Sequence, residues 1–75
     1  MHVDIYGMAG CGYCSKAIEL CEENDIPFSY YDIGQNIEHM KELSSRVAAF
    51  KTVPQIFIGD DHIGGYTQLE EHLND

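Results

Sequence analysis

Residues 2–14 read HVDIYGMAGCGYC, in which a short apolar run leads through flexible glycines to the motif Cys11-Gly12-Tyr13-Cys14. The alternating apolar residues at the start of this segment predict a strand. The apolar positions that follow share one face at the 3.6-residue period of a helix, and they are Cys14, Ala17, Ile18 and Cys21. Cys11 is therefore predicted to lie where a strand gives way to a helix.

This location favours a reactive thiol at Cys11. The first backbone N–H groups of a helix have no internal partner, and the helix dipole places partial positive charge there. The pKa of a free cysteine, about 8.5, can fall to roughly 3.5–7.5 in such a place. We expect Cys11 to be a nucleophile at neutral pH. Cys14, one turn further on, is expected to be shielded and to attack a disulfide formed on Cys11.

The C-x-x-C pair has two alternative interpretations, half of a zinc site and a structural pair of cysteines. Zinc normally needs two further Cys or His ligands at a matching spacing. Cys21 follows Cys14 by seven residues, about 10.5 Å along a helix, and the four histidines are scattered singly. We therefore favour redox chemistry without a metal site, and we interpret Cys21 as a buried and inert thiol.

The bulk composition is that of one small domain, residues 1–75, with a thin core. Three cysteines do not suit an extracellular disulfide scaffold, which normally has a larger and even number. No apolar run approaches the ~18 residues of a membrane span, and no signal peptide is recognisable. We expect a monomer in a reducing, cytoplasmic setting, without a membrane partner.

The charge is strongly acidic, with 13 acidic against 4 basic residues and a net charge of -9. This argues against a nucleic-acid partner, because phosphate contacts need clustered Lys or Arg. Lys16 follows the C-x-x-C motif closely, and Lys51 precedes a segment that we expect beside it. Either these are solvated surface lysines, or they form a small positive patch for an anionic substrate.

The rest of the chain alternates strand and helix patterns. Strands are predicted over residues 2–6, 28–33, 55–58 and 62–65, and helices over residues 13–24 and 37–50. The run Thr67-Gln68-Leu69-Glu70 matches a capping box that would begin a closing helix, with the Thr67 hydroxyl as its cap. The order βαβαββα predicts an α/β protein of thioredoxin-like fold, with a four-stranded mixed sheet flanked by three helices and with its first two strands parallel.

Thr52-Val53-Pro54 lies just before the third predicted strand. On the residues alone the Val53–Pro54 bond is expected to be trans, because only about 5–6% of X-Pro bonds in folded proteins are cis. A cis bond would leave the backbone N–H and C=O of Val53 free to pair with an extended thiol peptide beside Cys11.

Three motifs give the chain a resemblance to the glutaredoxin family over nearly its whole length. In chain order, and at the family's spacing, they are Gly10-Cys11-Gly12-Tyr13-Cys14, Thr52-Val53-Pro54-Gln55-Ile56-Phe57-Ile58-Gly59 and His62-Ile63-Gly64-Gly65-Tyr66-Thr67. The chain resembles the compact members found in bacteria and their phages. The resemblance implies the thioredoxin-like fold and reverses the expectation for Val53–Pro54 to cis.

The resemblance also implies a glutathione-dependent thiol–disulfide oxidoreductase. Cys11 would attack a protein disulfide or a protein–glutathione mixed disulfide, and Cys14 would resolve the protein mixed disulfide. Removing a glutathione adduct would need Cys11 alone. The glutathione groove implied for this chain is made by Tyr13, Lys51, Thr52, Val53, Pro54, Tyr66 and Thr67.

Three departures from the family's pattern leave alternatives open. Gly12 stands where dithiol members usually have proline, and some members with glycine there assemble a [2Fe–2S] cluster between two subunits with glutathione as co-ligand. Met8 replaces a common basic residue, and Gln68 replaces an acidic residue that contacts the glutathione amine. A weakened glutathione site would suit an electron donor to ribonucleotide reductase that is itself reduced by thioredoxin reductase.

Overall fold

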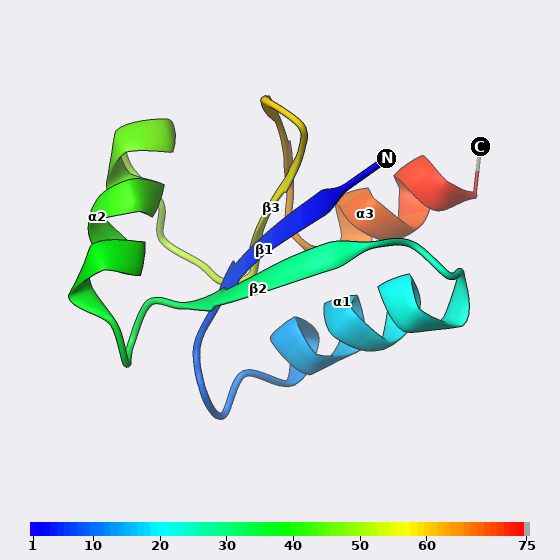
Figure 1. The fold of residues 1–75 in the computed structure, drawn as a ribbon, viewed down its shortest axis with the longest axis horizontal. Coiled ribbons are helices and arrows are strands. Elements are labelled where there is room, and N and C mark those ends of the chain that lie inside the picture. The colour runs from blue at the N-terminus through cyan, green and yellow to red at the C-terminus, as the bar shows by residue number, and fades with distance from the viewer. Residues whose placement is uncertain (75) are drawn as a thin grey trace.

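The computed structural model describes residues 1–74, which form one sheet with helices on both faces (Figure 1). The elements in chain order are β1 (Val3–Gly7), α1 (Gly12–Glu23), β2 (Phe28–Asp32), α2 (Ile37–Arg46), β3 (Gln55–Ile58), β4 (Asp61–Gly64) and α3 (Tyr66–Leu73). The predicted α/β fold with a four-stranded mixed sheet and three helices is confirmed.

The sheet has the strand order β2-β1-β3-β4. β1 pairs in parallel with β2 and antiparallel with β3, and β3 pairs antiparallel with β4. The register of the central pair places Tyr6 opposite Gln55. The carboxyl end of β1 and the amino end of β3 therefore lie at the same edge of the sheet.

Two hydrophobic clusters fill the two faces of this sheet. On one face α1 and α3 pack over β1 and β3, and the buried residues there are Val3, Ile5, Ala17, Cys21, Ile56 and Leu69. On the other face α2 packs with Tyr6, Ile33, Leu43 and Phe57. Each strand thus sends alternate side chains to opposite clusters, as the period of two requires. Figure 1 shows α2 standing apart from the other two helices.

The second helix is shorter than the sequence pattern predicts. A helix over residues 37–50 was expected, but α2 ends at Arg46 and Val47 has extended backbone angles, with φ -131° and ψ 118°. Val47 and Phe50 still pack against the cluster beneath α2. The periodic apolar residues were therefore correctly predicted to be buried, but the chain leaves the helix early to return to the start of β3.

The predicted cap of the closing helix is also wrong. The N-cap is Gly65, and Thr67 lies inside the first turn of α3. Gln68 Oε1 accepts the backbone N–H of Gly65 at 2.9 Å, which makes the returning contact of a capping box two residues earlier than expected. The ends of α1, β1, β2 and β4 differ by one residue from those predicted, which is the usual fraying at element ends.

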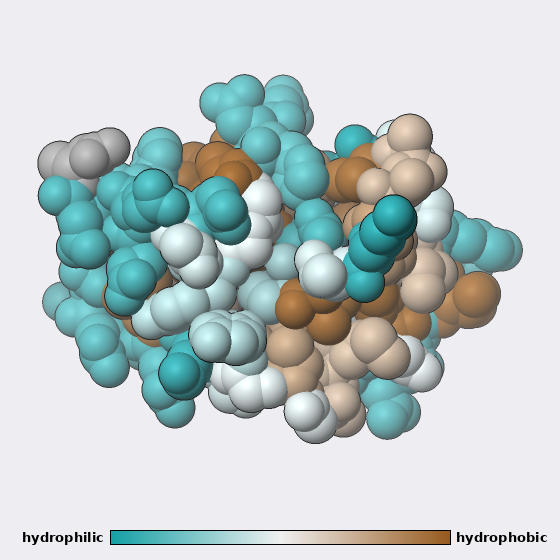
Figure 2. Space-filling model, turned by 180° about the vertical axis from the view of Figure 1, so that it is seen from behind, coloured by the Kyte–Doolittle hydropathy of each residue, from teal (hydrophilic) through white to brown (hydrophobic). Residues whose placement is uncertain are grey.

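Hydrophobic surface is unevenly distributed. Figure 2 shows it gathered toward the end of the molecule that carries α2, whereas the opposite end of this face is mainly hydrophilic. The exposed large hydrophobic residues are Met1, Met8, Tyr13 and Ile37. Among residues 1–74, no helix has both the length and the apolar character needed to cross a bilayer.

Arg46, the last residue of α2, fastens this helix to the sheet. Its guanidinium donates to Asp4 Oδ2 at 3.1 Å, to the Tyr6 hydroxyl at 3.1 Å and to the Gly59 carbonyl at 2.9 Å. It also lies over the Phe57 ring, 3.7 Å from the centroid. One partly buried side chain therefore joins α2, β1, β3 and the β3–β4 turn.

Replacing Arg46 with Ala is expected to lower the free energy of unfolding by about 2–3 kcal/mol. Hydrogen bonds to a charged group contribute about 1.5–3 kcal/mol, and the change removes the guanidinium partner of the Asp4 carboxylate. Urea denaturation followed by circular dichroism measures the loss. The matched control is Lys41→Ala on the same helix, whose exposed pair with Glu38 should contribute no more than about 0.5 kcal/mol. Equal losses in the two variants would contradict this account of Arg46.

Candidate active site

Cys11 is the N-cap residue of α1, where the chain turns from β1 into the helix. Gly10 has φ +81°, in the left-handed region that glycine adopts without steric cost. The turn brings the N–H of Cys11 to the Met8 carbonyl at 3.3 Å. Cys11 has extended backbone angles, and its sulfur accepts the backbone N–H of Cys14 at 3.2 Å. A negative charge on this sulfur would face the positive end of α1.

Cys14 lies behind Cys11, in the first turn of the helix, and is 1% exposed. The two cysteines form a disulfide with their Cα atoms 5.3 Å apart. Cys11 is only partly buried, so it is the more accessible of the two sulfurs. This asymmetry is what an attacking thiol and a shielded resolving thiol require.

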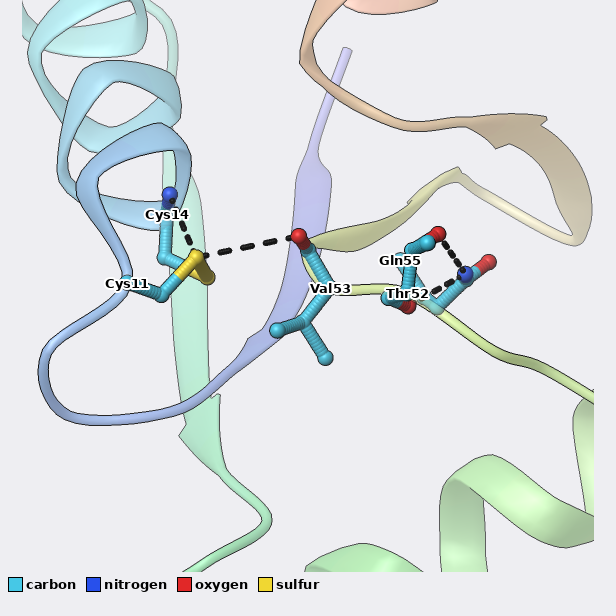
Figure 3. The surroundings of a disulfide bond; sticks show 5 residues. All are labelled: Cys11, Cys14, Thr52, Val53 and Gln55. Atoms are coloured by element: carbon cyan, nitrogen blue, oxygen red, sulfur yellow. Dashed lines mark hydrogen bonds between the residues drawn. A yellow bond between two sulfur atoms is a disulfide. The ribbon is translucent and has the colours of Figure 1, made fainter.

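The segment before β3 lies directly opposite Cys11. Figure 3 shows the Cys11 sulfur directed at the carbonyl oxygen of Val53, 3.7 Å away. The Val53–Pro54 bond is cis, as the family resemblance predicted. Gln55 Nε2 donates to the Thr52 carbonyl at 2.7 Å, and Gln55 Oε1 accepts a hydrogen bond from His62 Nε2 at 2.7 Å. This buried amide holds the backbone of the Thr52–Pro54 segment in place.

A groove of about 270 Å³ opens beside this pair of segments. Its lining residues are Tyr13, Thr52, Val53, Pro54, Gly65, Tyr66, Thr67 and Gln68. The ring centroids of Tyr13 and Tyr66, two of the lining residues, lie 5.7 Å apart. Six of the seven nominated groove residues are therefore brought together from three distant parts of the chain.

Lys51 is the nominated residue that does not line the groove. It is exposed and adjoins Thr52 at the groove's edge. Lys16 lies with its ammonium group 5.0 Å from the centroid of the Tyr13 ring. It also lines a second cavity of about 190 Å³ together with Glu19 and Glu23. Each lysine thus neighbours a groove residue, Lys16 in space and Lys51 in the chain, but neither lines the groove.

Two groove residues were missing from the set predicted as the site. Gly65 belongs to the third motif, and Gln68 was noted only as a departure from the family. The sequence signal for both was that they lie within two residues of Thr67 in the chain. The Gln68 side chain, however, is held by the Gly65 N–H and lies against Gly64, where a Cβ would come within 2.9 Å of Gln68 Cγ. Only the structure shows that the Gln68 side chain folds back onto the start of its own helix and so shapes the groove.

Cys21 is fully buried on the inward face of α1, as predicted. Burial, followed by the nearby carboxylate of Glu22, raises the pKa of its thiol. Among residues 1–74, no group of three or more His, Cys, Asp or Glu side chains is arranged to hold a metal ion.

The glutaredoxin family model matches residues 3–63, which include both cysteines and the whole Thr52–Pro54 segment. The chain belongs to the glutaredoxin family. This glutaredoxin is accordingly a thiol–disulfide oxidoreductase whose active-site disulfide is the Cys11–Cys14 pair.

Bacterial and plant glutaredoxins resemble it in sequence and structure. Glutaredoxin 1 of Escherichia coli is 37% identical over 75 residues, covering 92% of this chain and 88% of the relative. The structure of reduced E. coli glutaredoxin superposes with a TM-score of 0.81 at 34% identity, covering 99% of this chain and 94% of that one. A buckwheat glutaredoxin–glutathione complex superposes with a TM-score of 0.77 at 26% identity, covering 96% and 68%.

In the reduced protein, Cys11 should react with iodoacetamide at pH 7 at least about tenfold faster than Cys21. Its sulfur is partly exposed and accepts an N–H at the helix start, whereas Cys21 is buried and its thiol is harder to ionise. Peptide mapping by mass spectrometry after timed alkylation measures both rates in one sample. A Cys21 that reacts as fast as Cys11 would contradict the assignment of the reactive thiol.

Proposed function

We propose that this glutaredoxin uses glutathione as its reductant and acts on protein disulfides and on glutathionylated proteins. The observation that carries the proposal is the groove that runs from Tyr13 past the Thr52–Pro54 segment to the start of α3, beside Cys11. A peptide thiol lying in it would reach the Cys11 sulfur. The glutathione complex of the structurally similar buckwheat protein supports this choice of ligand.

The groove offers backbone and side-chain contacts that suit a small anionic peptide. Val53 presents its carbonyl beside Cys11, so an extended peptide could pair with its backbone. Thr67 and Gln68 lie in the first turn of α3, where backbone N–H groups have no partner within the helix and favour a carboxylate. Tyr13 and Tyr66 supply flat apolar walls. Tyr13, Thr52, Val53, Pro54, Tyr66 and Thr67 are the proposed glutathione contacts, with Lys51 at the edge.

The proposed reaction proceeds by two exchanges at Cys11. The Cys11 thiolate attacks one sulfur of a substrate disulfide, forming a mixed disulfide and releasing the other substrate sulfur as a thiolate. Cys14 then attacks the Cys11 sulfur, which releases the second substrate thiolate and forms the Cys11–Cys14 disulfide. Two glutathione molecules restore the dithiol and leave as glutathione disulfide. A glutathionylated substrate needs only Cys11, because a second glutathione can resolve the adduct.

The setting proposed for this reaction is the cytoplasm, with the protein acting as a monomer. The odd number of cysteines and the buried, unpaired Cys21 are compatible with a reducing compartment. The [2Fe–2S] alternative stays a prediction from Gly12, which begins α1 with open space where a Cβ would stand. Packing among the described residues therefore does not require a glycine at position 12.

The test follows NADPH consumption with a glutathione mixed disulfide, in the presence of glutathione and glutathione reductase. Wild type and Cys14→Ser are expected to turn over, whereas Cys11→Ser should fall to background because its nucleophile is gone. Reduction of a protein disulfide should require both cysteines. A fully active Cys11→Ser protein would refute the assignment. Turnover only when thioredoxin reductase replaces the glutathione system would assign the electrons to that enzyme, as for a ribonucleotide reductase donor.

Because Lys51 adjoins the groove, we predict that its charge contributes to the binding of the glutathione mixed disulfide. Lys51→Ala should raise the KM for the glutathione mixed disulfide by about 1.4- to fivefold at low salt, since exposed charge pairs contribute about 0.2–1 kcal/mol. The effect should shrink at high salt, because exposed charges are screened. Lys41→Ala, which removes an exposed lysine from α2, is the control for net charge. Identical KM changes in the two variants would place Lys51 outside the glutathione site.

A further inference from the structure

Tyr30, in the middle of β2, brings a hydroxyl group beside the resolving cysteine. The position that a Cβ on Gly7 would occupy lies 2.7 Å from Cys14 Sγ and 2.7 Å from the Tyr30 hydroxyl oxygen. Gly7 is the last residue of β1, which pairs with the strand of Tyr30 and leads into the active-site loop. The sulfur and the hydroxyl therefore flank the same small space, which stays open only because residue 7 has no side chain.

The hydroxyl of Tyr30 is not engaged by another group among residues 1–74. No hydrogen bond of the described residues involves it, whereas the hydroxyl of Tyr6 bonds to Glu42 and that of Tyr66 donates to Glu70. The Tyr30 ring is half-buried and packs against the cluster beneath α1 and α3. A partly desolvated donor without a partner is thus held next to a sulfur that becomes an anion during the reaction.

We propose that the Tyr30 hydroxyl donates a hydrogen bond to the Cys14 thiolate whenever the Cys11–Cys14 disulfide is opened. In that step a reductant thiolate attacks Cys11 Sγ and forms a new sulfur–sulfur bond. The Cys11–Cys14 bond breaks, and its electron pair leaves on Cys14 Sγ. The hydrogen bond stabilises this leaving thiolate, which later takes a proton from water. In the reverse direction the same contact favours the ionised Cys14 that attacks the mixed disulfide.

The charges around the Tyr30 hydroxyl favour a role as hydrogen-bond donor and disfavour a role as base. Burial, followed by the carboxylate of Asp32 on the same strand, raises the pKa of Tyr30. The phenol therefore keeps its proton at neutral pH and has it available to donate to an anionic sulfur. A hydrogen bond from a neutral hydroxyl to an anionic acceptor is roughly twice as strong as one between neutral groups. The contact would thus act on the ionised sulfur and little on the neutral thiol.

The inference rests on the two-cysteine reaction of the proposed function, but its test needs neither glutathione nor a protein substrate. Tyr30→Phe removes the hydroxyl and keeps the ring. Tyr31→Phe is the matched control, because Tyr31 adjoins it on β2 but faces the other cluster, where its ring stacks on Tyr6 at 4.9 Å. Both changes are made in wild type and in Cys11→Ser, where Cys14 is the only remaining active-site thiol.

The first measurement is the pH profile of Cys14 alkylation in the Cys11→Ser background, with peptide mapping to separate Cys14 from Cys21. Tyr30→Phe is expected to move the profile to higher pH and to slow alkylation at pH 7 about tenfold, the effect of losing one hydrogen bond to a charged group. Tyr31→Phe should leave the profile in place. An unmoved profile in Tyr30→Phe, or an equal shift in both variants, would overturn the proposal.

The second measurement is the rate at which dithiothreitol opens the Cys11–Cys14 disulfide in the proteins with both cysteines. A leaving thiolate of higher pKa departs more slowly, so Tyr30→Phe should open severalfold more slowly than wild type and Tyr31→Phe. Equal opening rates would also overturn the proposal. If both measurements change as expected while the glutathione assay fails, the proposed reductant is wrong and the role of Tyr30 stands. The opposite combination rejects Tyr30 alone.

Discussion

The antiparallel pairing of β1 with β3 is the constraint on which the active site depends. Because Tyr6 pairs with Gln55, the loop that leaves β1 and the segment that enters β3 must lie side by side. Cys11 and Val53 are 42 residues apart in the chain, yet sulfur and carbonyl oxygen are 3.7 Å apart. A slip of one residue in this pairing would reverse the faces of β3 and separate them.

The parallel pairing of β1 with β2 supplies the second requirement. Parallel strands need a crossover, and α1 is that crossover, so its amino end must begin where β1 ends. The cysteine at this junction becomes the helix N-cap and accepts an N–H from the first turn. The position of the Cys11 sulfur at the positive end of α1 is therefore a direct result of the sheet topology.

The two faces of the sheet contribute differently to the site and to stability. The face beneath α1 and α3 carries the cysteines, the groove and Tyr30, so chemistry and core share the same layer. The other face is fastened by Arg46 and the aromatic residues around it, and Val53 of the groove packs against this second cluster. The small chain thus keeps a groove at one edge of the sheet while Arg46 joins the strands to α2 on the other face.

The predicted fold and the paired cysteines followed from local patterns, because hydrophobic period and cysteine spacing are properties of neighbouring residues. The prediction failed where the tertiary structure departs from what the local sequence pattern indicates. Val47 and Phe50 continue the helical period of α2, but the chain must turn toward β3. Thr67 matches a cap by composition, yet Gly65 is the N-cap of α3, because the chain already turns out of β4 at Gly64, where φ is +115°.

The sequence by itself determined the order of elements, the reactive motif and the family, because each is written in contiguous residues. Only the tertiary structure decided which distant groups meet. It closed the groove with Gly65 and Gln68, left Lys51 at its edge, and placed the Tyr30 hydroxyl and the Cys14 sulfur around the empty side of Gly7. The physical reason is that strand pairing and helix packing set such distances, and neither interaction acts between residues that are neighbours in the chain.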